Sequence, residues 1–425
     1  MSAITIGQGA TWAIAALATG CVIVRPWRLP EALWAVLGAL GLVALSLLPW
    51  RDALRAVGSG ADVYLFLGGM MLLAELARQQ GVFDWLATRT VRLARGSAKR
   101  LFALVFAVAT LVTAFLSNDA TAVVLTPAVF AAAKAAKAEP LPYLFICAFV
   151  ANAASFVLPI SNPANLVVFG SHMPALGSWL ARFAFPSVMS IGATYVLLRL
   201  TQQAPLQQRI TADIQMTPLT RACRWTTFGI GLSAAVLLAA SAFEFKLGLP
   251  TFLVASLTAS IVLLEARQSP WRLLKEISWS VLPLVAGLFV LVEGLIRTGV
   301  IQHLSGTLMA AAASAPAATS WAAGSIVALA CNLMNNLPAG LMAHSVLATD
   351  ASVPPSVTNA LLIGVDLGPN LSVTGSLATI LWLVAIRREG ADISAWRFLR
   401  VGTLVMVPAL VLALAASIVG YHDGR

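Results

Sequence analysis

Charged residues are scarce in this sequence. Only 10% of its 425 residues are Asp, Glu, Lys or Arg, and 59% are hydrophobic, whereas about a quarter of a soluble globular domain is charged. No soluble fold of this length has enough interior to hide so much apolar surface. The composition therefore excludes a soluble globular protein and predicts an integral membrane protein.

Cysteines and catalytic motifs are also sparse. The four cysteines are widely separated and form no CxxC pair, which excludes a disulfide framework. There is no HExxH motif, and no Lys or His adjoins Ser117 or Ser161, so an intramembrane protease is disfavoured. Without a P-loop, any use of ATP requires a partner, and no basic stretch interleaved with aromatics points to nucleic acid. We predict no enzyme, no metal site and no cofactor.

Long apolar runs recur along the whole chain instead. About 20 helical residues cross a hydrocarbon core of roughly 30 Å. The first run lacks a basic leading region and a small-residue cleavage site, so we interpret it as a retained span and not as a signal peptide. Full spans are predicted at residues 8–24, 31–50, 61–79, 184–199, 226–243, 248–265, 277–296 and 398–419.

Four further apolar regions are interrupted by polar residues. Residues 101–133 and 321–348 each contain two short apolar stretches around a polar break, which predicts re-entrant hairpins. Residues 142–172 and 356–386 are long apolar segments interrupted by Ser, Asn, Pro and Gly, which predicts broken transmembrane helices. The expected fold is an all-α polytopic membrane protein with about ten spans plus two hairpins. An alternative, in which both hairpins cross the membrane fully, stays open.

Basic residues are distributed unevenly over the predicted loops. Lys99 and Lys134 flank the first hairpin, so both of its ends should face the cytoplasm. No Lys or Arg lies between Arg297 and Arg387, as expected for a second hairpin that opens outward. With a periplasmic amino terminus, 21 of the 27 basic residues face the cytoplasm, which satisfies the positive-inside rule and explains the net charge of +10. The other six are Arg51, Arg55, Arg182, Lys246, Arg297 and Arg425.

The order of these elements repeats along the chain. Residues 1–200 contain three spans, a hairpin, a broken span and a span. Residues 226–425 have the same order but start from the opposite side, and residues 201–225 form a cytoplasmic linker. The motifs also align, with Asn118 matching Asn336. An inverted repeat of this kind is typical of secondary transporters, whose binding site lies near the midplane where discontinuous helices meet.

Polar side chains gather at the four breaks. The ends of half-helices leave backbone N–H and C=O groups unpaired, and amides and hydroxyls both donate and accept hydrogen bonds. Such clusters suit a small neutral solute rich in hydroxyls or a partly dehydrated cation; the alternative is that they only cap and join helices. The absence of Lys and Arg argues against a guanidinium clamp for di- or tricarboxylates. The predicted substrate-binding residues are Ser117, Asn118, Ser161, Asn162, Asn165, Asn335, Asn336, Thr374, Gly375 and Ser376.

Two acidic residues accompany these clusters. Asp119 lies at the tip of the first hairpin, and Asp366 lies beside the second break. A carboxylate at membrane depth costs about 2.5–3.5 kcal/mol on insertion scales, and it is a candidate to bind a proton near neutral pH. We predict both as proton-coupling residues, with a paired structural acid as the alternative for Asp119. Glu75 and Glu293 are expected to be interfacial or interhelical, and His344 structural.

Four segments carry a family resemblance. Phe115–Pro127, Ser161–Leu166, Met334–Pro338 and Gly364–Leu383 resemble, in order, the motifs of the arsenical pump membrane proteins of the ion transporter superfamily. The resemblance covers essentially the whole chain. It implies arsenite and antimonite efflux by proton antiport across the bacterial inner membrane and, in some members, association with a soluble ATPase. The sequence departs from that family at Asn152, where an acid is common.

Alternatives for the function stay open. A sodium/proton antiporter or a dicarboxylate or citrate carrier of the same superfamily would use the same clusters, whereas inverted hairpins disfavour a passive channel. Trivalent arsenic is thiophilic, which makes Cys147 and Cys331 candidate ligands, although buried cysteines usually pack as small hydrophobes. We predict that amides and hydroxyls bind neutral arsenite, with the proton gradient as the energy source.

Overall fold

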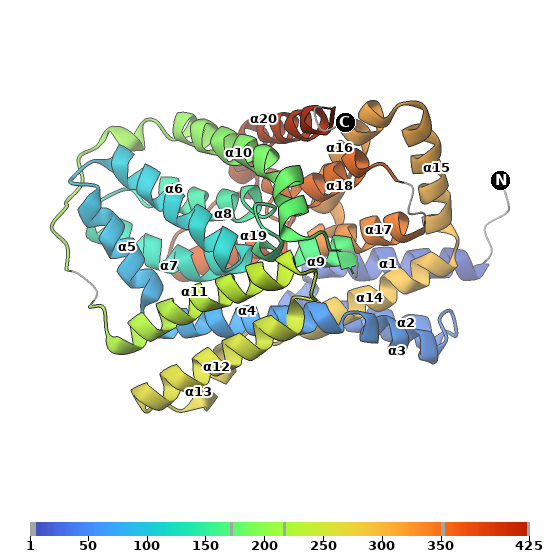
Figure 1. Ribbon diagram of the computed structural model, residues 1–425, viewed down its shortest axis with the longest axis horizontal. Helices are drawn as coiled ribbons and strands as arrows, with labels where there is room; N and C mark the ends of the chain where they lie inside the picture. The colour runs from blue at the N-terminus through green and yellow to red at the C-terminus, as the bar shows by residue number, and fades with distance from the viewer. Residues whose placement is uncertain (1–5, 171–172, 216–217, 350–352, 423–425) are drawn as a thin grey trace.

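The computed structural model describes residues 6–170, 173–215, 218–349 and 353–422, and the regular structure of this part of the chain is helical (Figure 1). The helices of the first half are α1 (Ile6–Val24), η1 (Pro26–Arg28), α2 (Glu31–Ala44), α3 (Trp50–Ser59), α4 (Ala61–Gln79), α5 (Val82–Leu93), α6 (Ala98–Phe115), the π-helical η2 (Ala120–Leu125), α7 (Thr126–Ala135), α8 (Leu141–Ala153), η3 (Pro159–Ser161), α9 (Pro163–Phe169) and α10 (Leu176–Thr201).

The second half follows a connecting segment that contains the short helix η5 (Pro205–Gln207). Its helices are α11 (Arg221–Ala242), α12 (Gly248–Ala266), α13 (Pro270–Glu276), α14 (Val281–Arg297), α15 (Val300–Ser314), α16 (Pro316–Met334), α17 (Asn336–Thr349), α18 (Pro355–Leu367), η6 (Gly368–Leu371), α19 (Leu377–Arg388) and α20 (Ala395–His422).

Many of these helices are long and apolar enough to cross a membrane. Over the described residues, seven qualify singly: α1, α6, α10, α11, α12, α16 and α20. The bent pairs α3/α4 and α13/α14, with angles of 48° and 42°, raise the number of candidate spans to nine. The predicted all-α polytopic fold is therefore confirmed.

Several element boundaries differ from the prediction. The run 31–50 is helical only to Ala44, because Pro49 caps the separate helix α3. Helices α5 and α15 were not predicted, since polar residues interrupt the apolar runs from which spans are recognised. The first arms of the hairpins, α6 and α16, have 18 and 19 residues and are longer than the short stretches expected.

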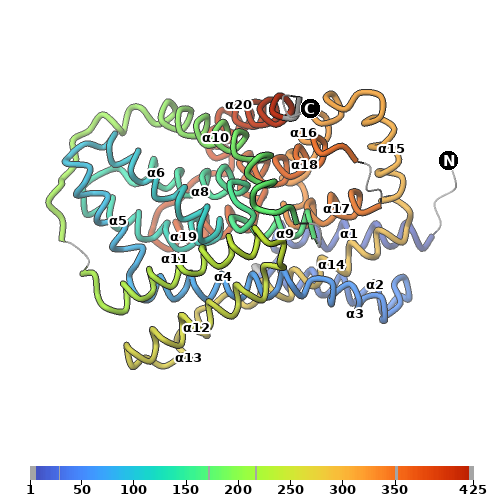
Figure 2. The backbone as a smooth tube through the Cα atoms, viewed as in Figure 1, coloured from blue at the N-terminus to red at the C-terminus, as the bar shows by residue number. Residues whose placement is uncertain are grey.

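Both predicted hairpin regions reverse at a polar tip. In Figures 1 and 2, α7 lies toward the same end of the molecule as α5, and α17 lies toward the same end as α15. The first reversal passes through residues 116–119, between α6 and η2. The second occurs at Asn335, whose φ of 74° lies in the left-handed region that Asn tolerates better than most residues.

Proline interrupts both broken helices. Pro159 lies between α8 and α9, Pro163 is the first residue of α9, and Pro369 lies between α18 and α19. Proline lacks a backbone N–H and disfavours a helical residue before it. The new helices then start from capping side chains: Asn162 and Ser376 accept backbone N–H bonds at 3.0 and 3.1 Å. The starts of α9 and α19 therefore follow from the local sequence, whereas α8 ends earlier, at Ala153.

The two halves use matching helix contacts. Between the halves, helix α4 packs on α12 and α2 packs on α14; within each half, α6 packs on α8 and α16 packs on α18. Further contacts between the halves join α9 to α17, α7 to α19 and α10 to α20. Helix α10 ends at Thr201 and α11 begins at Arg221, which leaves a connection inside the predicted linker 201–225. The inverted relation between residues 1–200 and 226–425 stays a prediction that this order of elements supports.

A tight glycine contact holds the second break against its hairpin. A Cβ atom at Gly368 would lie against the Cα of Ala328 in α16 and 2.5 Å from its carbonyl oxygen. We expect Gly368→Ala to lower the free energy of unfolding by about 1–3 kcal/mol, the usual cost of overpacking. Thermal unfolding in detergent measures the effect. Gly192→Ala is the matched control, because a Cβ there meets nothing within 4 Å; equal melting temperatures for both variants would contradict the packing.

Candidate functional site

The first break is held by its own polar side chains. The Oγ of Ser161 donates to the carbonyl of Ala114 in α6 at 3.1 Å, which joins the break to the first hairpin. The amide of Asn165 donates to the carbonyls of Ser155 and Leu158 at 2.9 and 3.2 Å. Both side chains therefore stabilise the irregular backbone, while the Oδ1 of Asn165 is buried without a hydrogen-bond partner.

The second break is organised by a residue that the sequence analysis did not single out. The amide nitrogen of Asn332 in α16 donates to the carbonyl of Gly368 at 3.0 Å, and its Oδ1 accepts from Ser372 at 2.7 Å. The Thr374 hydroxyl donates to the backbone carbonyl of Asn332 at 3.0 Å. Gly375 lies so close that a Cβ there would be 2.8 Å from Asn332 Oδ1. The predicted residues Thr374 and Gly375 thus dock the break on the second hairpin.

The hairpin tips bury their polar residues. Ser117 accepts from the backbone N–H of Ala120 at 3.1 Å, and Asn118 accepts from that of Asp119 at 2.9 Å. In the second hairpin, Asn335 accepts from a backbone N–H at 3.3 Å. Side-chain hydrogen bonds are found neither for Asp119 nor for Asn336 within the described part of the chain, so these two groups are available for a ligand or proton.

Hydrogen bonds also join the two halves. Asn162, at the first break, donates to Asp366 Oδ1 at 2.8 Å. Asn152 of α8 donates to Asn370 Oδ1 at 3.0 Å and to the Thr379 hydroxyl at 3.3 Å. Asp366 is fully buried, and its Oδ2 has no hydrogen-bond partner. The two broken helices therefore meet around one buried carboxyl group and a set of amides.

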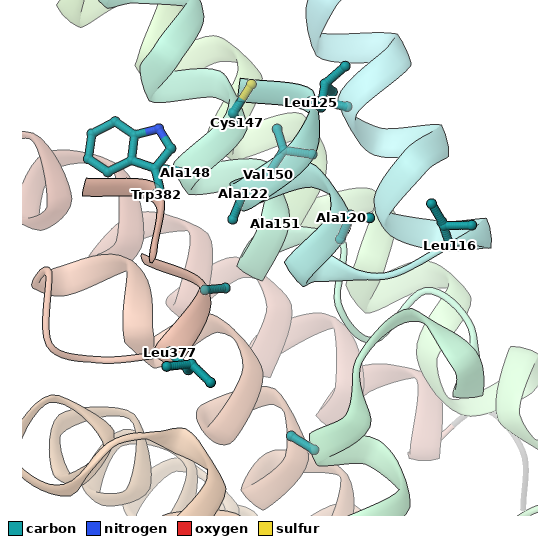
Figure 3. Close-up of a cluster of buried hydrophobic side chains, with 14 of the residues drawn as sticks. Leu116, Ala120, Ala122, Leu125, Cys147, Ala148, Val150, Ala151, Leu377 and Trp382 are labelled. Carbon is teal, nitrogen blue, oxygen red and sulfur yellow. The ribbon is translucent and has the colours of Figure 1, made fainter. Parts of the chain in front are cut away.

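Apolar packing surrounds this polar contact. Cys147 is fully buried in it, and Cys331 is buried against the carbonyls of Gly364 and Val365, with Sγ–O distances of 3.9 and 3.7 Å. Over the described residues, His, Cys, Asp and Glu form no group of three that could hold a metal ion. Figure 3 shows Cys147, Ala148, Val150 and Ala151 on α8, with Leu116, Ala120, Ala122 and Leu125 of the first hairpin and Leu377 and Trp382 of α19 around them.

The structure brings some of the predicted residues together and separates others. Asn162 and Asp366 are hydrogen-bonded to each other, whereas the two hairpin tips share no hydrogen bond over the described residues. At the level of whole elements, η2 contacts α19 and α17 contacts α9. Each hairpin therefore lies against the broken helix of the other half.

The other titratable candidates lie outside this polar contact. Glu75 accepts from Arg78 of the same helix, α4, at 2.6 and 2.8 Å, and Arg78 also lies 3.8 Å from Glu276 of α13. Glu293 and His344 line a cavity of about 370 Å³ between α3, α4, α9, α14 and α17. None of the ten predicted substrate-binding residues lines this cavity. Leu166 and Val167 of α9 and Leu341 of α17 lie on its wall instead.

Two of the missed residues had a signal in the sequence. Asn332 lies in the last turn of α16, close in sequence to the predicted residues Asn335 and Asn336. Asn370 lies inside the segment Gly364–Leu383 that carries the family resemblance. Their partners lie far away in sequence, and only the packing of the two halves identifies them.

Broken helices, hairpins that reverse at polar tips and a buried polar meeting point, in a chain with seven to nine candidate spans over the described residues, are features of a secondary membrane transporter. The sequence profile of the citrate transporter family matches residues 16–365. The chain belongs to this family, whose members are multi-pass membrane transporters and not enzymes. The predicted place in the ion transporter superfamily and the bacterial inner membrane is confirmed.

Similar proteins include transporters from several bacteria. The chain is 28% identical over 358 residues to the arsenical pump membrane protein of Escherichia coli K12, covering 82% of this chain and 83% of that protein. It is 27% identical over 413 residues to an uncharacterized transporter of Mycobacterium tuberculosis, covering 92% and 94%. The crystal structure of the Alcanivorax borkumensis YdaH transporter superposes with a TM-score of 0.60 at 16% identity, over 92% of this chain and 98% of that one. This last likeness concerns the fold alone.

Proposed function

We propose that the protein exports arsenite and antimonite across the inner membrane by proton antiport with alternating access. The observation that carries the proposal is the chemistry of the buried polar residues. Over the described residues they are amides and hydroxyls with two acids, Glu75 and Asp366, and they include no Lys or Arg. Glu75 is paired with Arg78, so Asp366 is the one acid at the meeting point of the breaks.

This chemistry suits arsenite. Arsenite is a neutral trihydroxide at neutral pH, and each of its O–H groups both donates and accepts a hydrogen bond, as amides and hydroxyls do. Asn336, at the tip of the second hairpin, has no side-chain hydrogen bond within the described residues and can supply such groups. Asn118 and Asn162 each hold a structural bond and can add their remaining donor and acceptor capacity. The family's arsenical pump relatives support the same substrate.

Proton coupling is assigned to Asp366 and Asp119. A carboxylate that is withdrawn from water without a cation beside it is neutralised most simply by a proton. Asp366 is fully buried and Asp119 half-buried, and neither has an ion-pair partner among the described residues. Protonation would change the hydrogen bond between Asp366 and Asn162, which joins the two halves. Arsenite binding and proton binding would then alternate at the contact between Asp366 and Asn162. No cofactor is needed, and a soluble ATPase stays a proposed additional partner.

Citrate or another organic anion is the second candidate substrate, because the family profile describes citrate transporters. A tricarboxylate is usually held by guanidinium or ammonium groups, and the meeting point of the breaks has none. Half-helix dipoles alone would have to hold the anion. A sodium/proton antiporter would use the same oxygens, but the hydroxyl-rich neutral solute matches the donors as well as the acceptors.

Resistance of living cells tests the substrate. Expression in a host that lacks arsenite export should raise growth in arsenite and antimonite and lower the cellular arsenic content at least about tenfold, whereas arsenate, an anion, should not be exported directly. Cells that carry the empty vector are the control, and citrate uptake is measured in the same strains. Unchanged arsenic content with verified membrane expression, together with citrate accumulation, would contradict the proposal and favour the organic anion.

A further inference from the structure

A second cavity, lined by none of the ten predicted substrate-binding residues, has a basic lining. It has a volume of about 390 Å³ and lies between the start of α6, the end of α10 and the segment that follows α10. Lys99 and Arg199 line it together with Gln203 and Gln207, and no acid does. Neither cation forms an ion pair with the described residues. The lining therefore favours an anion, with two charges and two amides to bind it.

The cavity continues onto an apolar surface. Val196 and Leu200 line it from α10, and they are 52% and 53% exposed. Because α10 is one of the long apolar helices that can span the membrane, these exposed side chains can face lipid chains. A ligand that fits the whole cavity is amphiphilic, with an anionic head near Lys99 and Arg199 and an apolar part along α10.

A backbone hydrogen bond lies beside the cavity. Ile210, beyond the cavity, donates its N–H to the Gly96 carbonyl at 3.1 Å, so the segment after α10 is tied to the start of α6. Leu206 lines the cavity and is buried. The same segment connects the two halves of the chain. A ligand in this cavity would therefore brace the connection between the halves.

We propose that this cavity binds a phospholipid with an anionic headgroup, its phosphate between Lys99 and Arg199. The positive-inside distribution places both residues on the predicted cytoplasmic side, where anionic lipids attract basic residues close to the membrane surface. Free phosphate shares the headgroup chemistry but cannot use the apolar wall formed by Val196 and Leu200. The lipid is therefore the ligand that accounts for both parts of the lining. This site is independent of the transported substrate.

Thermal unfolding of the delipidated full chain in detergent tests the proposal. Phosphatidylglycerol should raise the melting temperature of the wild type by about 3 °C or more, since a ligand that binds only the folded state stabilises it, whereas phosphatidylcholine and inorganic phosphate should not. Lys99→Gln/Arg199→Gln should lose this shift. The matched control is Arg388→Gln/Arg397→Gln, which removes two exposed charges from the same predicted side, outside the cavity, and should keep the shift.

The same preparations can be compared by native mass spectrometry. Wild type and control should retain phosphatidylglycerol under conditions in which Lys99→Gln/Arg199→Gln loses it; if the double variant folds poorly, the two single variants are compared instead. Equal retention by all variants would overturn the proposed site. A shift produced by inorganic phosphate alone would overturn the lipid as its ligand, and equal shifts with phosphatidylcholine would show an unspecific lipid effect.

Discussion

Asp366→Asn is expected to lower arsenite flux driven by a proton gradient at least about tenfold, equivalent to about 1.4 kcal/mol in the barrier. The side chain is fully buried, and its Oδ1 accepts from Asn162 while its Oδ2 has no partner. Asparagine is nearly isosteric and keeps an oxygen for the Asn162 amide, so the fold and the contact between the halves should persist. It cannot take up and release a proton at neutral pH, so coupling should be lost.

Flux is measured in everted membrane vesicles, with arsenite exchange in the absence of a gradient as the second readout. Exchange should persist in Asp366→Asn, because the amides and hydroxyls around the breaks are unchanged. The matched control is Asp392→Asn in the loop between α19 and α20. The Arg387 hydrogen bond holds the pKa of Asp392 below its ordinary value, so this exposed acid stays ionised near neutral pH and carries no proton. Wild-type coupling in Asp366→Asn would show that the proton travels elsewhere.

Asp119→Asn is expected to give a loss of similar size in gradient-driven flux. Asp119 lies at the tip of the first hairpin, just before the π-helical segment η2, and its carboxyl has no hydrogen bond within the described part of the chain. A carboxyl that is bonded to nothing else can bind a proton without first breaking a structural contact. Asparagine at this position should preserve the hairpin, because Asn118 and Ser117 make the bonds that hold the tip.

The comparison of Asp119→Asn with Asp119→Glu distinguishes a role of Asp119 in proton coupling from a purely structural role. Glutamate keeps a titratable group at the tip and should restore part of the gradient-driven flux, whereas asparagine should restore none. Both variants are first matched for membrane expression and melting temperature. If Asp119→Asn transports arsenite against a gradient as well as the wild type does, Asp119 is a structural acid, and Asp366 alone would carry the proton.

Local sequence predicted most of the fold. Apolar runs identified spans such as α1, α11 and α12, because a membrane requires about 20 apolar helical residues in a row. Pro163 begins α9 and Pro369 follows the end of α18, so proline marks both breaks, whereas the end of α8 at Ala153 is not set by a proline. Helices α5 and α15 were missed because polar residues interrupt their sequences, and only uninterrupted apolar runs were taken as spans. Helix α2 was predicted too long because hydropathy alone does not register the turn before Pro49.

The candidate site could be predicted only in part. Ser161 and Asn162 were predicted as site residues because polar side chains are costly inside a membrane unless they bind a partner or a ligand. Their partners, Ala114 and Asp366, lie far away in sequence, so the sequence did not identify them. Asn332 and Asn370 were missed for the same reason: Asn332 bonds to Gly368 and Ser372, and Asn370 to Asn152, all of them far away in sequence. Their roles follow from packing between hairpins and breaks, which a sequence does not display directly.

Arsenite uptake into everted vesicles under an imposed proton gradient tests the central claim most directly. With an acidic lumen, vesicles that contain the protein should accumulate arsenite, lose the accumulation when a protonophore is added, and release lumenal protons as arsenite enters. Sodium and citrate should neither drive nor replace this flux. Arsenite uptake equal to that of empty-vector vesicles, with citrate or sodium transported instead, would contradict proton-coupled arsenite efflux.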